Sequence, residues 1–212
     1  MRDNTTPKEK LLKKVRKALL EKRDNPYPSL EDLPHYPAHD KLPEILFAEQ
    51  FSTVSGQFVF CEDEGQFIEN LLELAEERKW RKIYCWEPPL QQILSRYGYP
   101  FFETDRSFEY ADVGFTLCEA LIARNGSILV SNANMAGRRL SIYPPVHVVF
   151  AYTSQLVIDL KDGFKLLKNK YGDNLPSMVS VITGPSRTAD IEKTLVLGAH
   201  GPKELFVFLI DG

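Results

Sequence analysis

The sequence predicts an α/β protein with a mostly parallel sheet, and three observations support this. Short apolar runs rich in Val, Ile and Phe alternate with amphipathic helical patterns between residues 43 and 172. Proline, glycine and Asn-Gly turn signals separate the two kinds of segment. Between residues 126 and 160 strands follow one another without long helices, so we expect some antiparallel pairing there.

Length and composition bound the class of protein. A chain of 212 residues suffices for one substantial domain with its own core. Its 43% hydrophobic and 26% charged residues are typical of a soluble globular protein. No apolar run approaches the ~20 residues of a membrane span. The N-terminus lacks the apolar core of a signal peptide, so we expect a cytoplasmic protein.

Residues 1–24 predict a basic amphipathic helix. Nine Lys or Arg stand against three Asp or Glu in residues 1–23. One helical face collects the apolar residues Leu11, Leu12, Val15, Ala18 and Leu19. Either this face packs on the chain's own domain or it docks on an acidic partner. The rest of the chain is acidic, which argues against nucleic acid as the main ligand.

A proline-rich connector is expected at residues 25–42. Four prolines lie in residues 25–42 and Pro43 follows them, and proline both fixes its own φ and biases the preceding residue away from helix. We therefore expect an extended segment, followed by a single domain at 43–212. The connector's two histidines have no set of four well-spaced ligands around them, so no metal site is expected.

Helices and strands alternate in the first half of this domain. The expected elements, in order, are a helix (44–55), a strand (56–61), a helix (63–80), a strand (82–86) and a helix that starts with proline (88–98). Asp63 is the expected N-cap of the long helix. The residues expected to face inward are Phe67, Leu71, Leu74 and Ala75.

Strands dominate the second half. The expected elements, in order, are a strand (111–116), a turn or helix (118–124), three strands (126–131, 146–152 and 155–160), a helix (163–172), a buried strand (177–183), a short helix (190–198) and a final strand (204–210). Asn125-Gly126 is a strong turn signal. Asp190 and Gly198 are the expected N-cap and end of the short helix.

The loop 184–188 is a candidate anion site. In open α/β sheets, ligands bind outside the carboxyl ends of strands, and a loop that feeds a helix offers free N–H groups. Ser186 and Thr188 add hydroxyls, and Arg187 adds a fork for phosphate or carboxylate. The alternative is that Gly184 only shapes a turn and that the arginine pairs with an acid. Neither a Walker A nor a G-x-G-x-x-G motif is present.

Four other residues have side chains that could serve in a functional site. Glu119, an acid amid apolar residues, is a candidate general base or nucleophile, or else a capping or salt-bridged glutamate. Arg138 and Arg139 are candidate anion ligands on the surface. His147 lies within a strand pattern, where a hydrogen-bonded core histidine is the expected outcome.

Residues 182–211, "ITGPSRTADIEKTLVLGAHGPKELFVFLID", resemble the C-terminal signature of the lactate utilisation protein C family, which carries the LUD domain. The blocks "VGFTLCEALIARNGSILVS" and "GRRLSIYPPVHVVF" are also similar to that family. The resemblance extends over residues 43–212. The signature residues that match are Gly184, Pro185, Ser186, Arg187, Thr188, Asp190, Glu192, Gly198, His200 and Gly201.

This resemblance implies a fold and a role. The family's fold is like that of ribose-5-phosphate isomerase, glucosamine-phosphate deaminase and the CoA transferases. The implied role is that of an accessory subunit in the oxidation of L-lactate to pyruvate, beside iron–sulfur partner subunits. Many relatives have an acid two residues before the turn glycine, where this chain has Arg124. A mechanism that uses that acid therefore does not transfer directly.

A small anionic ligand is expected at the loop 184–188, with Arg138 or Arg139 and with Gly201 nearby, and His200 is expected to move a proton. No cofactor is expected on this chain, because its three separated cysteines do not provide the four thiolates of an iron–sulfur cluster. Two alternatives stay open. One is a stand-alone enzyme acting on a phosphosugar, CoA thioester or nucleotide, and the other is a non-catalytic assembly protein, with homo-oligomerisation possible in either.

Overall fold

The computed structural model describes residues 6–21, 40–136, 139–191 and 194–212, which fall into two units, Met1–Asp40 and Lys41–Gly212. The first unit contains the predicted N-terminal helix as α1 (Pro7–Leu20). Thr6 and Glu9 begin it with a reciprocal capping box, which satisfies two backbone donors. No residue of α1 is buried. What covers its apolar face stays a prediction.

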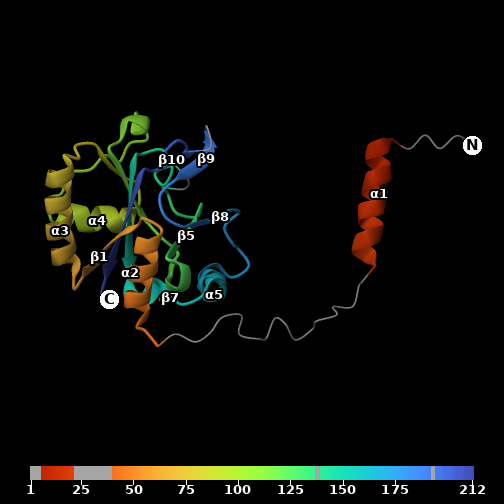
Figure 1. Ribbon diagram of the computed structural model, residues 1–212, viewed down its shortest axis with the longest axis horizontal. Coiled ribbons are helices and arrows are strands. Elements are labelled where there is room, and N and C mark those ends of the chain that lie inside the picture. Colours follow the sequence, from red (N-terminus) through yellow and green to blue (C-terminus); the bar gives the residue numbers. More distant parts are fainter. Residues whose placement is uncertain (1–5, 22–39, 137–138, 192–193) are drawn as a thin grey trace, which may run out of the picture. The chain divides into compact units, whose positions relative to one another are not determined.

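The second unit is built on a parallel sheet of five strands, which confirms the predicted fold class (Figure 1). Each strand in it runs parallel to its neighbours. In spatial order the strands are β1 (Gln57–Cys61), β11 (Glu204–Ile210), β6 (Val146–Tyr152), β3 (Val113–Leu117) and β2 (Ile83–Cys85). Their carboxyl ends therefore meet at one edge of the sheet, where ligands of α/β proteins commonly bind.

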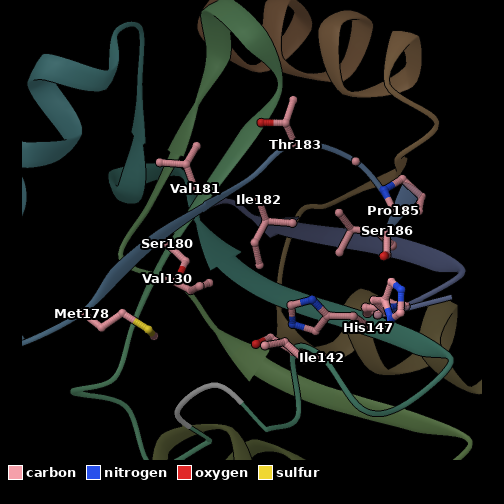
Figure 2. A pocket seen from close by; sticks show the side chains of 16 residues that line it. Val130, Ile142, His147, Met178, Ser180, Val181, Ile182, Thr183, Pro185 and Ser186 are labelled. Atoms are coloured by element: carbon pink, nitrogen blue, oxygen red, sulfur yellow. The ribbon is translucent and has the colours of Figure 1, made fainter. Parts of the chain in front are cut away.

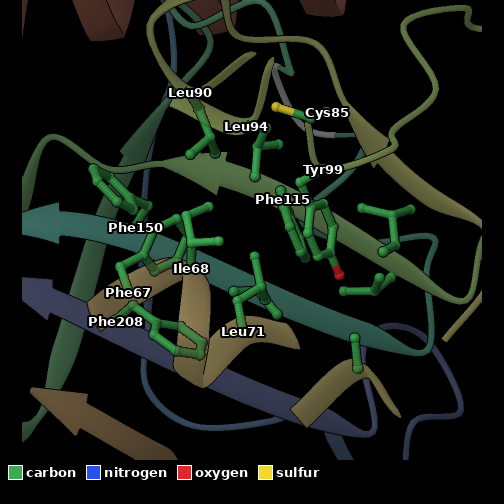
Figure 3. Close-up of a cluster of buried hydrophobic side chains, with 14 of the residues drawn as sticks. Phe67, Ile68, Leu71, Cys85, Leu90, Leu94, Tyr99, Phe115, Phe150 and Phe208 are labelled. Carbon is green, nitrogen blue, oxygen red and sulfur yellow. The ribbon is translucent and has the colours of Figure 1, made fainter. Parts of the chain in front are cut away.

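Two helices, α3 (Glu64–Arg78) and α4 (Pro88–Arg96), cover one face of this sheet. Asp63 is the N-cap of α3, as predicted, and accepts a hydrogen bond from the N–H of Gln66. Phe67 packs edge-to-face against Phe150 and Phe208, with ring centroids 4.8 and 5.2 Å apart (Figure 3). Alternate residues of β6 and β11 thus anchor the helices, and the residues between them point to the opposite face.

A second sheet packs on that opposite face, together with α2 (Pro43–Thr53). Its strands, in spatial order, are β7 (Leu156–Val157), β4 (Ala120–Ile122), β5 (Ser127–Ser131) and β8 (Val179–Ile182). β5 pairs antiparallel with both of its neighbours, which confirms the antiparallel pairing expected in this part of the chain. Helix α5 (Leu160–Tyr171) covers the outer face with Leu167.

Residues 118–124 do not form the predicted turn or helix. Their apolar centre is strand β4, completely buried between β5 and β7, and a short 3₁₀ turn follows it. Gly126 ends the turn at φ 59°, and a Cβ there would lie 2.4 Å from the backbone nitrogen of Phe51. Because α2 approaches so closely, position 126 has no room for a side chain and requires glycine. The 3₁₀ segments are η1 (Phe108–Tyr110), η2 (Ala123–Asn125) and η3 (Thr153–Gln155).

The predicted helix at 190–198 is wrong. This segment forms the hairpin of β9 (Arg187–Ile191) and β10 (Thr194–Leu197). β-Branched residues recur along it, and such residues favour strands. The preceding strand also differs from its prediction, because β8 is an edge strand whose Val181 is 43% exposed. No helix N-terminus therefore follows the loop 184–186.

Candidate functional site

Five of the ten signature residues line one cavity of about 280 Å³, which we name the signature cavity (Figure 2). It lies between the end of β8 and the amino ends of β6 and β11. Its lining residues are Val130, Ser141, Ile142, His147, Met178, Ser180, Val181, Ile182, Thr183, Gly184, Pro185, Ser186, His200, Gly201, Pro202 and Leu205. The structure thus brings together four of the predicted site residues: Gly184, Ser186, His200 and Gly201.

Backbone hydrogen bonds hold the walls of the signature cavity together. The N–H of Ser186 donates to the carbonyl of Pro202 at 2.9 Å, and the carbonyl of Ser186 accepts from the N–H of Gly198 at 2.9 Å. A Cβ on Gly201 would lie 2.9 Å from Cβ of Ser186, so glycine permits this close approach. The expectation that the N–H of Ser186 is free for an anion is corrected, because that N–H already has a partner.

His147 supplies a buried polar group to the cavity. It is fully buried on β6, and its Nε2 lies 2.8 Å from Oγ1 of Thr116 on the neighbouring strand β3. Nδ1 has no hydrogen-bond partner among the described residues. Burial lowers the pKa of His147 to about 3, so the imidazole is neutral at physiological pH. It can therefore bind a hydroxyl or a carbonyl without adding charge.

The remaining polar groups in the lining are hydroxyls and one exposed imidazole. Oγ1 of Thr183 lies 2.7 Å from Oγ of Ser127, and Ser141 and Ser186 also line the cavity. Among the described side chains of the lining, His200 is the one basic group besides the buried, neutral His147. The cavity therefore favours a small ligand with few charges.

Arg187 does not line the signature cavity. Its guanidinium donates to the carbonyl oxygen of Val54 and to Oγ of Ser55, at 3.1 Å for the latter. These residues follow the last turn of α2, where a positive charge stabilises the free carbonyls. Thr188 also lies outside the lining, on β9 opposite Val196. The hydrogen bonds of Arg187 therefore link the end of α2 to the segment that follows Ser186.

Arg139 does not complete the cavity either. The guanidinium of Arg139 lies over the ring of Trp86, 4.5 Å from its centroid, and 3.5 Å from Asp105. It is exposed and absent from the lining. Arg138 lies outside the described residues, so its predicted contact with a ligand stays a prediction.

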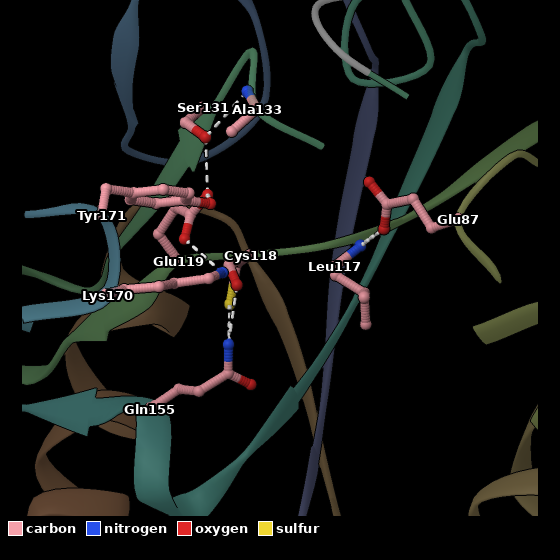
Figure 4. A network of polar contacts seen from close by, with 9 residues as sticks. All are labelled: Glu87, Leu117, Cys118, Glu119, Ser131, Ala133, Gln155, Lys170 and Tyr171. Carbon is pink, nitrogen blue, oxygen red and sulfur yellow. Dashed lines mark hydrogen bonds and ion pairs between the residues drawn. The ribbon is translucent and has the colours of Figure 1, made fainter. Parts of the chain in front are cut away.

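Glu119 is held in a closed network at the carboxyl edge of the parallel sheet (Figure 4). Its Oε1 accepts hydrogen bonds from Ser131 at 2.5 Å and from the Tyr171 hydroxyl at 2.9 Å, and its Oε2 accepts from Nζ of Lys170 at 2.9 Å. Glu119 is therefore a salt-bridged glutamate, which is one of the alternatives left open by the sequence. Glu119 lies outside the signature cavity, and its catalytic role stays untested.

Glu87 is a second buried acid at this edge, and the sequence interpretation missed it. One carboxylate oxygen, Oε2, accepts the N–H of Leu117, while Oε1 has no hydrogen-bond partner in the described part of the chain. Burial and then the nearby charge of Glu119 raise the pKa of Glu87 to about 7. Its position directly after the strand pattern 82–86 was the signal that pointed to it.

A second cavity of about 210 Å³ opens beside these acids, and we name it the edge cavity. It lies at the carboxyl ends of β3 and β6, against the start of α4. Its lining residues are Pro89, Ile93, Leu117, Cys118, Asn134, Phe150, Tyr152, Gln155 and Lys170. This is the edge where general rules for α/β sheets place ligands.

The three cysteines are buried free thiols. Burial raises the pKa of all three, to about 12 for Cys85. Within the described ranges, no group of three or more His, Cys, Asp or Glu side chains is arranged to hold a metal ion. The described helices include none that is long and apolar enough to cross a membrane.

Comparison with known proteins identifies the family. A sequence model of the LUD domain matches residues 46–210. The chain belongs to the LUD domain family. Lactate utilization protein C 1 of Bacillus mycoides is 36% identical over 103 residues, which are 48% of this chain and 44% of that protein. Lactate utilization protein C of Bacillus licheniformis is 31% identical over 169 residues, or 77% of this chain and 66% of that protein.

These matches confirm the resemblance to the lactate utilisation protein C family. The chain nevertheless spans only about half to two thirds of the length of these relatives. A crystal structure of a DUF162 family protein from Deinococcus radiodurans has the same fold, with a TM-score of 0.56 and 18% identity. That alignment covers 82% of this chain and 99% of the other.

Proposed function

We propose that this LUD domain protein serves in lactate utilisation by binding a small hydroxy or oxo acid in the signature cavity. Relatives that carry the name lactate utilization protein C support the role. The observation that carries the proposal is the convergence of the signature residues Gly184, Ser186, His200 and Gly201 with the buried, incompletely bonded His147. Iron–sulfur proteins are the proposed partners.

The chemistry of the lining matches such an acid. Neutral His147 bonds its hydroxyl or carbonyl, and Ile142 and Leu205 contact its apolar part. The carboxylate faces His200 at the exposed end, where an N–H of the imidazole can donate a hydrogen bond to it. At about 280 Å³ the cavity lies just below the range of about 300–1,000 Å³ that drug-sized ligands occupy, which suits a small metabolite.

The oxidation itself is assigned to partners. Electrons removed from lactate need a redox group, and the cysteines of this chain are buried in separate places as neutral thiols. The proposed division of labour gives ligand binding to this chain and electron transfer to the iron–sulfur partners. No step of the oxidation is assigned to a residue of this chain.

Isothermal titration with L-lactate and pyruvate tests the ligand. Replacing His147 with Gln removes one buried hydrogen bond of about 0.5–1.5 kcal/mol, so we expect the affinity to fall about three- to tenfold. The Ser186→Ala variant is expected to show a similar loss. Ser95→Ala, an exposed change on α4, is the matched control and should bind as the wild type does. Equal binding by all four proteins would contradict the proposal.

Affinity purification from the source organism grown on L-lactate tests the partners. Recovery of iron–sulfur proteins in stoichiometric amounts is the expected result. If the chain is recovered alone and converts a phosphosugar, thioester or nucleotide by itself, the stand-alone enzyme is the correct alternative. A His147→Gln chain that still recovers the same partners would show that ligand binding and assembly are separate functions.

A further inference from the structure

We propose that the edge cavity is a second ligand site, which binds a small carboxylate through Lys170 while Glu87 takes up a proton. This site is separate from the signature cavity and does not depend on the function proposed above. Three elements of the parallel half contribute to it, namely the ends of β3 and β6 and the first half of α4. The helix α5 brings Lys170 to the same place.

Lys170 provides the positive charge of the edge cavity. Its side chain is 54% exposed, and its ammonium lies 2.9 Å from Oε2 of Glu119 (Figure 4). An ammonium has three N–H donors, and Glu119 and Tyr171 engage two of them. The donor that remains can reach a ligand in the cavity that Lys170 lines. A carboxylate is the small anion that such a donor and an apolar cavity suit together.

The rest of the lining selects for a short apolar body. Pro89, Ile93, Leu117 and Phe150 form the apolar walls. The amide of Gln155 is already bonded to the carbonyl of Cys118, at 2.6 Å. A volume of about 210 Å³ corresponds to about seven water molecules, at about 30 Å³ each. The cavity therefore fits a carboxylate of three or four carbons.

Glu87 couples this site to protons. Glu87 lines a narrow gap with Thr116, Ser131 and Ser141, which shares Leu117 and Asn134 with the edge cavity and Val130 and Ser141 with the signature cavity. The residue is 2% exposed. The charges of both Glu119 and Lys170 act on it. A bound carboxylate adds a negative charge to the same surroundings and makes the protonated form of Glu87 more favourable.

Several ionisable groups of the described residues lie around Glu87. They are Glu119 after β3, Lys170 and Tyr171 on α5, the thiols Cys85 and Cys118, and His147, which is bonded to Thr116; Arg138 lies outside the described residues. The thiols are protonated and His147 is neutral near pH 7. Glu119 and Lys170 balance one another. The proton on Glu87 is therefore the one that decides the net charge of the site near neutral pH.

Titration calorimetry with propanoate at pH 6 and pH 8 tests this coupling. With a pKa of about 7, Glu87 is about nine-tenths protonated at pH 6 and one-tenth at pH 8, so we expect affinity to fall about tenfold. Glu87→Gln mimics the protonated acid and should bind equally at both pH values. Repeating the titration in two buffers of different ionisation enthalpy should show proton uptake that this variant lacks.

Two variants separate this site from the signature cavity. Lys170→Gln combined with Glu119→Gln removes the cation without leaving a buried charge, and should abolish propanoate binding. His200→Gln should bind propanoate with the wild-type pH dependence. The proposal is overturned if wild-type protein does not bind propanoate at pH 6, if Glu87→Gln keeps the pH dependence, or if the His200 variant rather than the double variant loses binding. Circular dichroism confirms that each variant is folded.

Discussion

Glu87 and Glu119 occupy equivalent places but have different surroundings. Each follows a strand of the parallel sheet by two residues, at neighbouring strands β2 and β3, and each is buried. Glu119 has a cation and two hydroxyls as partners, whereas Glu87 has only backbone N–H groups near it, and its Oε1 has no hydrogen-bond partner among the described residues. The comparison teaches that the number of partners, more than burial, separates a structural acid from a candidate functional one.

The largest expected effect is at Glu119. Replacing it with Ala leaves the Tyr171 and Ser131 hydroxyls without their acceptor, removes the partner of Lys170 and opens a cavity, so we expect the free energy of unfolding to fall by about 3–4 kcal/mol. Urea denaturation at pH 7 measures this loss. Glu119→Gln keeps the hydrogen-bond acceptor and should lose less. A loss below about 1 kcal/mol in the alanine variant would show that the network is not structural.

Glu87→Gln should have the opposite sign. The pKa of Glu87 rises from 4.5 to about 7 on folding, so the unfolded chain loses its proton first and the stability of the wild type falls between pH 4.5 and 7. That cost is about 3 kcal/mol above pH 7, at 1.36 kcal/mol per pH unit. The glutamine variant is therefore expected to be more stable than the wild type at pH 8, by up to this amount.

The same variant should match the wild type near pH 4.5, where Glu87 is protonated in the folded chain and only beginning to ionise in the unfolded chain. Urea titrations at pH 4.5, 6 and 8 give the three differences in free energy. An unchanged difference across this range would mean that Glu87 does not hold its proton near neutral pH. Glu87 and Glu119 would then both be structural carboxylates.

Arg187→Met is expected to have the smallest effect. It removes the hydrogen bonds to Val54 and Ser55 at the end of α2 but leaves the signature cavity's lining in place, so we expect a loss of about 1 kcal/mol in stability. Lactate titration of the same variant should give a wild-type affinity. A selective loss of binding without a loss of stability would restore the anion clamp that the sequence suggested.

Most of the fold could be predicted from residue patterns. Periodicity and caps located α3, α4 and α5 and the strands of the parallel sheet, because each of these elements has one face that must be buried. The helix predicted at 190–198 was wrong because Asp and Gly, which suggested its cap and its end, are also common in turns. The pairing between β9 and β10 makes this segment a hairpin instead. Caps and turn residues in a sequence do not show which strand a segment will pair with.

The candidate site was predictable only in part. The signature residues mark the cavity, but Arg187 turns away from it toward a carbonyl that no sequence pattern reveals. Thr116 and Ser141 join the site through strand register and loop folding, which bring residues distant in sequence together. Glu87 could have been found by applying to β2 the carboxyl-edge rule that was applied only to the strand before Gly184.

The end of α2 has a consequence for how relatives are recognised. Gly126 approaches Phe51, while Gly184 approaches Val54 so closely that a Cβ would lie 2.2 Å from its carbonyl oxygen, and Arg187 binds the same carbonyl. Some residues of the C-terminal signature are thus needed for the contact between the end of α2 and the loops at Gly126 and Gly184. A protein that has the motif but no helix in the place of α2 would lack the surface that shapes the loop. Transfer of a binding role between relatives should therefore require both segments.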